Sequence, residues 1–282
     1  MKKYIWIAMI ALLSSTAFAQ TEADFNVALT DDGTGVVITG YTGRAVQVRI
    51  PATIQGMPVR EIGFDAFYGN KDITSVVIPQ GVTKINGNGN FPQREGAFSD
   101  ASKLSSVTIP EGVTEIGERA FAGCDSLTAV TLPRSLTTLG SRAFFSSGLR
   151  TVALPGGITE IGSEVFMYSR NLTTVIVAAG VTRIAHAMFS ECTALTTVTL
   201  PDSIRSIDQM AFYRCRALTA VNIPASITRI EDKAFDSCSA LTAVTVPDSM
   251  GRITIDIDAF NGASKLNLAS QAALRRIGWG GF

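Results

Sequence analysis

Four cysteines are the residues of this chain best suited to redox or metal chemistry. Cys192, Cys215 and Cys238 are spaced 23 residues apart, and Cys124 holds the same place in an earlier copy of the same motif. Paired thiols can form a disulfide, and thiolates can bind zinc. The equivalent positions of other copies hold small residues: Asn70, Ala101, Ser147, Ser169 and Ala263. This exchange favours buried, reduced thiols over a disulfide or a metal site.

The other residues that could carry chemistry are scattered. His186 is the only histidine, so neither a Ser-His-Asp triad nor a histidine metal cluster can be assembled, and we expect it at the surface. The segment 31–35, DDGTG, predicts a hairpin turn, and 86–90, NGNGN, lacks the lysine of a phosphate-binding loop. No metal, cofactor or enzymatic activity is therefore expected. A site for acid–base catalysis is the alternative that the sequence leaves open, because six acidic residues lie in predicted turns: Glu111, Glu115, Glu160, Asp202, Asp208 and Asp248.

A motif of 23 residues positions all of these groups. Its copies begin at seven leucines that are 22 or 23 residues apart: Leu104, Leu127, Leu149, Leu172, Leu195, Leu218 and Leu241. Each copy reads L-x-x-V-x-[IL]-P, then two turn residues, then [VIL]-T-x-I-G-x-x-A-F-x-x-C. A fixed period in this range predicts a solenoid, in which every copy adds one rung to a continuous core.

The motif resembles the BspA-like class of leucine-rich repeats. In the copy that begins at Leu104, the resemblance rests on Val107, Ile109, Pro110, Ile116, Gly117, Ala120, Phe121 and Cys124. In-phase copies carry it across residues 50–262. The resemblance implies a β-rich solenoid: a leucine-rich repeat right-handed superhelix of about nine 23-residue rungs with a parallel sheet, capped at both ends.

Apolar and polar residues alternate in the first part of each copy and predict one strand per rung. Val198 and Leu200 are expected to face the core, while Thr197 and Thr199 face outward. The following proline lacks an N–H and ends the strand, and the I-T-x-I part predicts a second, shorter extended segment. The phenylalanines predict an internal aromatic ladder of nine rings: Phe67, Phe98, Phe121, Phe144, Phe166, Phe189, Phe212, Phe235 and Phe260.

The ends of the chain depart from the motif. Residues 1–19 combine two lysines, an apolar run and a final Ala-Phe-Ala, which predicts a secretory signal peptide cleaved near Ala19. Residues 20–49 predict an N-terminal β cap, because the first rung would otherwise expose its apolar side. Residues 50–262 form the leucine-rich repeat solenoid, and 263–282 predict a C-terminal cap with a short helix.

Two further expectations concern particular segments. The short helix of the C-terminal cap is expected to begin near Ser270 and to end at Gly278. The insertion 86–93, NGNGNFPQ, predicts a surface loop, since it is rich in glycine and asparagine. Without 1–19 the chain has 22 basic and 24 acidic residues, a balance that excludes nucleic acid as a partner.

The outward positions of the regular strands form a candidate binding face: Thr151, Thr174, Ile176, Thr197, Thr199 and Asn222. This face is expected to be flat, uncharged and rich in threonine over about six rungs, and its side chains are not needed to fill the core. Such a surface suits a protein ligand. Phe145, Tyr168 and Tyr213 form an alternative edge, which would suit a glycan if the exposed aromatic side chains lined one groove.

The resemblance supplies the biological setting, because BspA-like proteins are commonly secreted or surface proteins linked to adhesion and host matrix binding. The leading hypothesis is an exported or cell-surface protein that mediates protein–protein interaction, with adhesion to host or matrix proteins as its specific form. It would be secreted, periplasmic or held at the cell surface, with no membrane insertion of the mature chain. A glycan-binding module is the alternative hypothesis, and an enzyme is the third.

Overall fold

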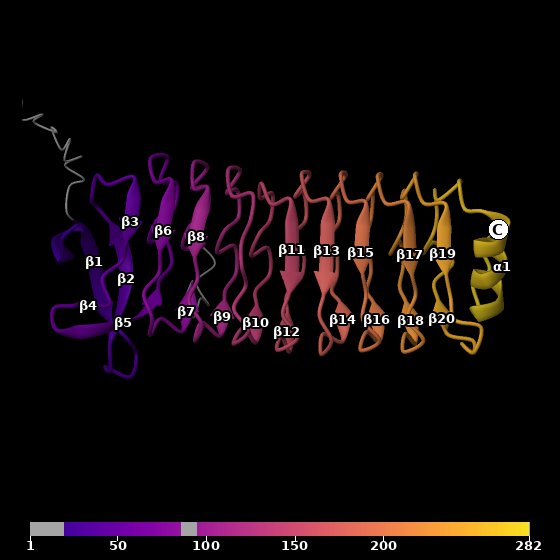
Figure 1. Cartoon of the computed structure of the whole chain (residues 1–282), viewed down its shortest axis with the longest axis horizontal. Coiled ribbons are helices and arrows are strands. Elements are labelled where there is room, and N and C mark those ends of the chain that lie inside the picture. Colours follow the sequence, from indigo (N-terminus) through magenta and orange to yellow (C-terminus); the bar gives the residue numbers. More distant parts are fainter. Residues whose placement is uncertain (1–19, 86–94, 282) are drawn as a thin grey trace, which may run out of the picture.

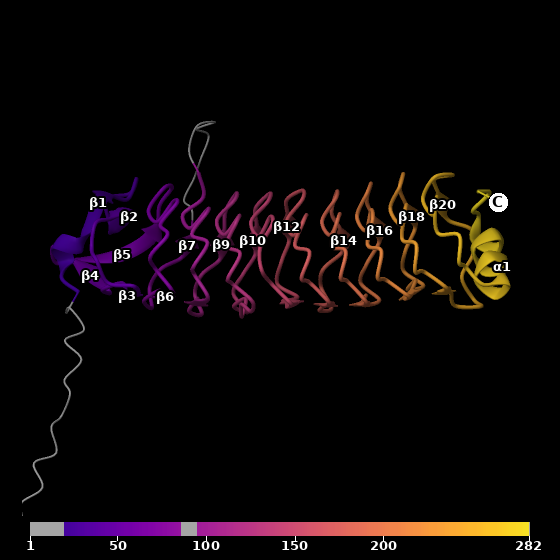
Figure 2. The same ribbon diagram turned by 90° about the horizontal axis from the view of Figure 1, so that it is seen from above.

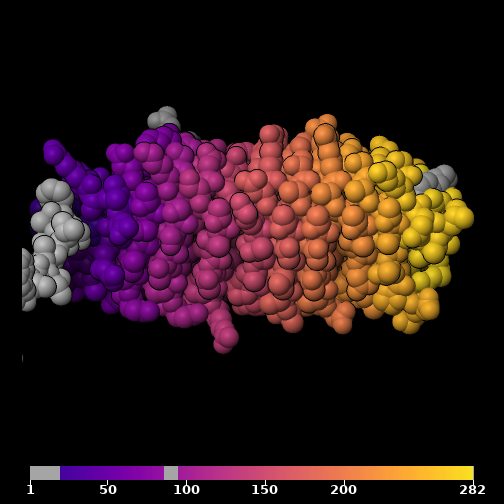
Figure 3. Space-filling view, turned by 45° about the horizontal axis from the view of Figure 1, so that its top comes forward, coloured from indigo at the N-terminus to yellow at the C-terminus, as the bar shows by residue number. Residues whose placement is uncertain are grey.

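The computed structural model describes residues 20–85 and 95–281, so the predicted signal peptide and the predicted loop at 86–93 lie outside the described residues. The repeats stack as successive rungs of a straight rod, with a β-hairpin at one end and a helix at the other (Figures 1 and 2). On the surface the rungs form parallel bands that follow the order of the chain (Figure 3). The fold is thus the β-solenoid that the period predicts.

The first strands of the rungs contribute to a stack that we call the strand face. The copy that begins at Leu127 is an exception to the predicted strand per rung, because its segment 127–133 forms no strand and the stack is interrupted there. Its pairings are all parallel, and residues one period apart pair in register, such as Val152 with Val175 and Val175 with Val198. The strands form three short sheets: β3 (Gln47–Arg49), β6 (Ser75–Val77) and β8 (Ser106–Thr108); β11 (Thr151–Leu154), β13 (Thr174–Val177) and β15 (Thr197–Thr199); β17 (Ala220–Asn222) and β19 (Ala243–Thr245).

The I-T-x-I part of each copy forms the predicted second stack of strands, which is also parallel along the rungs. Its isoleucines and leucines face the core, so both stacks enclose one continuous apolar interior. The strands are β5 (Met57–Ile62), β7 (Lys84–Ile85), β9 (Glu115–Ile116), β10 (Thr138–Leu139) and β12 (Glu160–Ile161), then β14 (Arg183–Ile184), β16 (Ser206–Ile207), β18 (Arg229–Ile230) and β20 (Thr254–Ile255).

The predicted phenylalanine ladder occupies the interior. All nine rings are buried, and neighbouring rings stack with centroids 4.8 to 5.5 Å apart and ring planes within 3° to 16°. The ends of the chain extend this ladder beyond the motif. Tyr41 stacks on Phe67, and Trp279 meets Phe260 edge-on at 5.2 Å. One aromatic column therefore joins both terminal segments to the repeats.

Many threonines of the motif hold neighbouring rungs together. The hydroxyl of Thr173 donates to the carbonyl oxygen of Arg150 at 3.0 Å, and that of Thr196 donates to the carbonyl of Thr173 at 3.1 Å. In the second stack, Thr137 does the same to Thr114. Each such hydroxyl satisfies a backbone acceptor one rung away. These threonine positions therefore have a structural role. The sequence pattern alone does not distinguish them from the outward threonines of the strand face.

The turn around each ladder phenylalanine forms a third surface, which we call the turn face. The residues two before and two after the phenylalanine adopt the left-handed conformation on most rungs, as Arg119 (φ 54°), Arg142 (58°), Tyr168 (62°) and Arg214 (57°) do. Backbone hydrogen bonds between rungs, such as Phe121 N to Ala143 O at 2.8 Å, hold this turn in place. Large side chains are uncommon at positive φ, so here the neighbouring rungs impose the conformation.

The N-terminal segment 20–49 contains the predicted hairpin. After a turn of 3₁₀ helix, η1 (Glu22–Asp24), β1 (Phe25–Leu29) pairs antiparallel with β2 (Val36–Tyr41), and β2 pairs parallel with β5. The short strand β4 (Thr53–Ile54) pairs antiparallel with β5. In the hairpin turn, Thr30 and Thr34 donate hydrogen bonds to Asp32 and lower its pKa to about 2. The ionised carboxylate of Asp32 therefore stabilises the folded hairpin. This stabilisation is lost as the pH falls from the ordinary pKa of an aspartate towards 2.

The predicted C-terminal helix is α1 (Leu268–Ile277), which packs against β19. Its N-cap differs from the expectation, because Asn267 accepts the hydrogen bond from Ser270 N at 2.8 Å. Ser270 lies inside the helix, and its hydroxyl accepts a hydrogen bond from Val244 N, a backbone group at the open edge of β19. The helix ends, as predicted, at Gly278, with φ 123°.

Candidate functional site

The four cysteines are free thiols that belong to the core. All are buried, and the thiols of Cys192, Cys215 and Cys238 donate to the carbonyl oxygen of the ladder phenylalanine one rung earlier, at 3.1 to 3.2 Å. Burial raises the pKa of Cys124 and of Cys238 to about 12. Because the thiolate is the reactive form, these side chains are chemically silent, as the exchange with small residues predicts.

We expect thiol titration of the native protein, without reductant, to detect none of the four cysteines. After denaturation the same reagent should detect about four thiols per chain, because unfolding removes the burial that suppresses the thiolate. The measurement is absorbance of the released chromophore with and without denaturant. A count of two or fewer after denaturation would show a disulfide and contradict the structure.

His186 is half-buried, so it is less exposed than the sequence suggests. Asp208 is paired with Arg183 at 3.3 Å and accepts a hydrogen bond from Ser206, and Glu115 lies 3.6 Å from Lys84. No group of three or more histidine, cysteine, aspartate or glutamate side chains in the described part of the chain could hold a metal ion.

The strand face brings the six predicted binding residues into two adjacent columns. Thr151, Thr174 and Thr197 pair in one column, and Ile176 and Thr199 lie in the next. Ile176 is 51% exposed, and among the six residues only Thr174 is half-buried. Asn222 follows two rungs after Ile176 and accepts a hydrogen bond from Thr245 at 2.7 Å. The hydroxyls of Thr151, Thr174, Thr197 and Thr199 have no hydrogen-bond partner among residues 20–85 and 95–281, so they are available to a ligand.

The alternative aromatic edge is brought together only in part. Phe145 and Tyr168 meet edge-on with ring centroids 5.5 Å apart, and Arg142 and Arg170 lie over these two rings at 5.8 and 5.7 Å. Tyr213 lies three rungs after Phe145 and contacts Arg214 at 4.9 Å. Among the described residues its ring meets neither Phe145 nor Tyr168, so only the first two rings of the predicted edge are brought together.

A groove of about 650 Å³ lies on the turn face, and the sequence did not point to it. Its lining combines charged and small side chains with one aromatic ring: Lys71, Glu95, Ser99, Asp100, Ser102, Arg119, Ala122, Gly123, Asp125, Arg142, Phe145 and Ser146. A small residue after the ladder phenylalanine on two consecutive rungs, Ser99 and Ala122, is the sequence signal that could have revealed the hollow.

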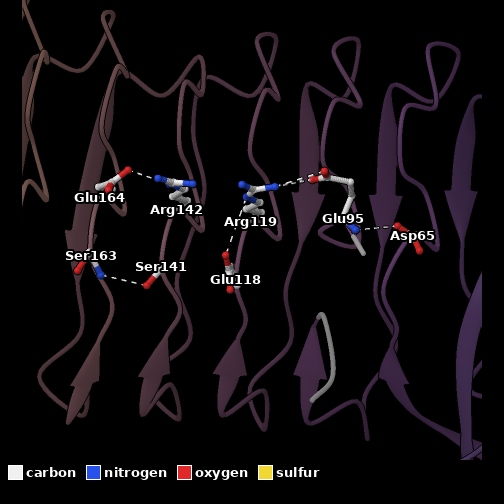
Figure 4. Close-up of polar contacts among 8 residues, drawn as sticks. All are labelled: Asp65, Glu95, Glu118, Arg119, Ser141, Arg142, Ser163 and Glu164. Atoms are coloured by element: carbon white, nitrogen blue, oxygen red, sulfur yellow. Dashed lines mark hydrogen bonds and ion pairs between the residues drawn. The ribbon is translucent and has the colours of Figure 1, made fainter. Parts of the chain in front are cut away.

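Four charged side chains follow one another across the rungs of this groove (Figure 4). Arg119 donates to both carboxylate oxygens of Glu95 at 3.2 and 3.3 Å, and Arg142 donates through Nε to Glu164 at 2.8 Å. The two arginines lie on adjacent rungs, and each glutamate lies on the outer side of its arginine. The hydrogen bond that Arg142 donates to Glu164 raises the pKa of Arg142.

Comparison with known proteins matches this repeat to a described family. The sequence profile of the BspA type leucine rich repeat region matches six copies, over residues 93–179 and 159–280. The chain belongs to this family. BspA-type repeats are typical of bacterial surface proteins, and the family consists of scaffolds that are mostly not enzymes.

Solved structures of bacterial leucine-rich repeat proteins share this fold. The leucine-rich repeat protein of T. pallidum is 26% identical with a TM-score of 0.60, and the match covers 92% of this chain and 96% of that one. A leucine-rich repeat protein of Eubacterium ventriosum ATCC 27560 is 19% identical with a TM-score of 0.51, covering 85% and 93%. No curated protein matches the chain. Within residues 20–85 and 95–281, no helix has the length and apolar character needed to cross a membrane.

Proposed function

We propose that this BspA-type protein is exported and binds another protein through its strand face. The observation that carries the proposal is the array of outward threonines on β11, β13 and β15, whose hydroxyls have no hydrogen-bond partner in the described part of the chain. Elsewhere in the repeat, threonine hydroxyls bond to the next rung. A rigid array of free donors and acceptors around an exposed isoleucine offers both hydrogen bonds and apolar contact to a partner.

The composition of the strand face favours a partner surface of low charge. Its six residues are uncharged, so the contact would depend little on ionic strength. The central Ile176, 51% exposed, supplies the kind of apolar anchor that is surrounded by polar contacts in protein interfaces. The backbone beneath it is fixed by parallel pairing on both sides, so the face would bind without an ordering cost.

The specific role that we propose is adhesion to a host or matrix protein at the cell surface. Support comes from the predicted signal peptide at 1–19 and from the family, whose members are typical of bacterial surfaces. A binding array of matrix proteins and glycans, probed with the purified protein, would identify the ligand class. Binding to matrix proteins and not to glycans is the expected result, and the reverse pattern would contradict the proposal.

We expect Thr174→Arg or Thr197→Arg to weaken binding of that protein ligand by about 2 kcal/mol or more, because each places a bulky charge at the centre of the contact. Affinity is measured by surface plasmon resonance. Thr182→Arg is a matched control, since Thr182 is exposed just before β14 and the next rung already has Arg205 at the equivalent position.

Asp236, which directly follows a ladder phenylalanine, is unsuitable as a control position. Its side chain is only 8% exposed and accepts a hydrogen bond from Ser237 at 2.8 Å, so an arginine there would disturb the fold. If Thr182→Arg abolishes binding while Thr174→Arg and Thr197→Arg leave it intact, recognition lies away from the strand face. Equal thermal melting of the three variants ensures that affinity, and not folding, is compared.

A further inference from the structure

The strand face begins at β3, which has a neighbouring strand on one side only. β3 pairs with β6, and no strand within residues 20–85 and 95–281 pairs with its other edge (Figure 1). Backbone groups of alternate residues in a strand point to opposite sides. Ile50 N, directly after β3, donates to Val77 O on the side of β6 at 3.1 Å. The backbone groups of Gln47 and Arg49 therefore point to the open edge.

A side-chain amide occupies part of this open edge. Nε2 of Gln20 donates to the carbonyl oxygen of Gln47 at 2.9 Å, and Oε1 of Gln20 accepts from Arg49 N at 2.6 Å. One donor and one acceptor are also what the peptide groups of an added strand present. The N–H of Gln47 and the carbonyl oxygen of Arg49 still have no partner in the described part of the chain. Gln20 therefore stands in for part of a strand, and the edge can accept more.

A groove of about 570 Å³ lies beside this edge. Its lining combines the edge residues with apolar side chains: Gln20, Gln47, Arg49, Ile50, Pro51, Ala52, Val77 and Pro79. Arg49 is the one charged residue of this lining, and its exposed side chain makes no ion pair within residues 20–85 and 95–281. The groove therefore combines open backbone groups, an apolar surface and a cation that no carboxylate compensates.

We propose that this edge binds an extended peptide of another protein as an added strand. The peptide bonds to the outward N–H and carbonyl groups of Gln47 and Arg49, packs its apolar side chains in the groove and places a carboxylate at Arg49. It displaces the carboxamide of Gln20, which acts as a built-in competitor and lowers the affinity. The site lies at the N-terminal end of the rod, away from β11, β13 and β15, and goes beyond the proposed function.

A second copy of this chain is a less suitable occupant. The C-terminal edge of the strand face is closed by Ser270, which accepts from Val244 N, so the copy would have to pair through its own N-terminal end. Both ends would then bring together the same acidic residues: Glu22, Asp24, Asp31 and Asp32. Like charges beside a strand edge oppose pairing between identical chains.

Calorimetric titration of the purified protein with the peptide Thr-Val-Glu-Val-Thr, acetylated and amidated at its ends, tests this site. Its β-branched residues favour the extended form. One control peptide has Gln in place of Glu, and the other is N-methylated at its valines and glutamate, so that it lacks strand donors. We expect the first peptide to bind and each control to bind at least about fivefold more weakly. Absence of binding by the first peptide, or equal binding of the N-methylated one, would overturn the proposal.

Variants of the protein test the competition and the edge separately. Gln20→Ala should bind the glutamate peptide at least about fivefold more tightly, because the carboxamide no longer competes. Arg49→Ala loses the charge and should weaken binding, and Arg49→Pro, which also loses the N–H at an edge where proline is tolerated, should weaken it further. Thr174→Arg on β13 is the control and should leave peptide binding unchanged. Equal affinities of the parent protein and Gln20→Ala would overturn the proposal. Self-association of Gln20→Ala without peptide, measured by light scattering, would also overturn it and assign the edge to a second copy.

Discussion

Replacing Phe189 or Phe212 by alanine is expected to lower the free energy of unfolding by about 3 to 5 kcal/mol. Both rings are fully buried. Phe189 stacks between two ladder rings, with centroids 5.5 Å away on one side and 5.4 Å on the other. Alanine would leave a cavity that the neighbouring rungs cannot close, because their backbone hydrogen bonds fix the spacing. Chemical denaturation followed by circular dichroism measures the change.

Phe145 provides the matched control for this prediction. It is a phenylalanine of the same turn and directly follows the ladder residue Phe144, but its side chain is half-buried on the turn face. Phe145→Ala loses mainly the edge-on contact with Tyr168, so the expected cost is about 1 kcal/mol. A loss below about 1 kcal/mol for Phe189→Ala, or equal losses for the two positions, would show that the ladder does not carry the stability assigned to it.

Deletion of residues 263–282 is expected to cause aggregation while the remaining rungs still form. This segment satisfies the open backbone groups of the last rung. Ser270 accepts from Val244 N at 2.8 Å, and Arg276 donates to the carbonyl oxygens of Pro247, Asp248 and Met250 at 3.0 to 3.1 Å. The deletion also removes Trp279 from the end of the aromatic ladder. An open strand edge beside an exposed apolar core pairs with other chains.

Multi-angle light scattering measures this outcome directly, together with circular dichroism for the strand content. Deletion of residues 280–282 alone is the control, because it retains α1, Arg276 and Trp279. We expect the control to stay monodisperse. A longer truncation that is also monodisperse and melts at the unchanged temperature would refute the capping role that we propose for this segment.

Much of the architecture could be predicted because it depends on positions within a single copy of the motif. The valine of the strand, the second isoleucine and the ladder phenylalanine face the core in every rung, and their spacing alone reveals this. The sequence also predicted the free, buried cysteines, because small residues replace them in other copies. The strand face could be predicted in the same way, because its residues are the outward-facing half of the alternating apolar and polar pattern.

The features that could not be predicted depend on contacts between rungs. Neighbouring side chains such as Arg142 and Glu164 are 22 residues apart in sequence, and the motif does not say which way a turn side chain points. Left-handed backbone at these turns sets that direction. Tyr168 itself has this conformation, whereas Tyr213 does not, and side chains from the turns of successive rungs together line the groove.

The sequence by itself therefore determined the solenoid, its period and its core, since each follows from residue types at fixed spacing. Only the tertiary structure decided which threonines are already bonded and which are free, that Asp236 is buried, and that Asn267 instead of Ser270 caps α1. It also placed two arginines side by side between two glutamates. The physical reason is that stacking brings together groups from separate copies, and the partners of each group depend on the geometry between rungs.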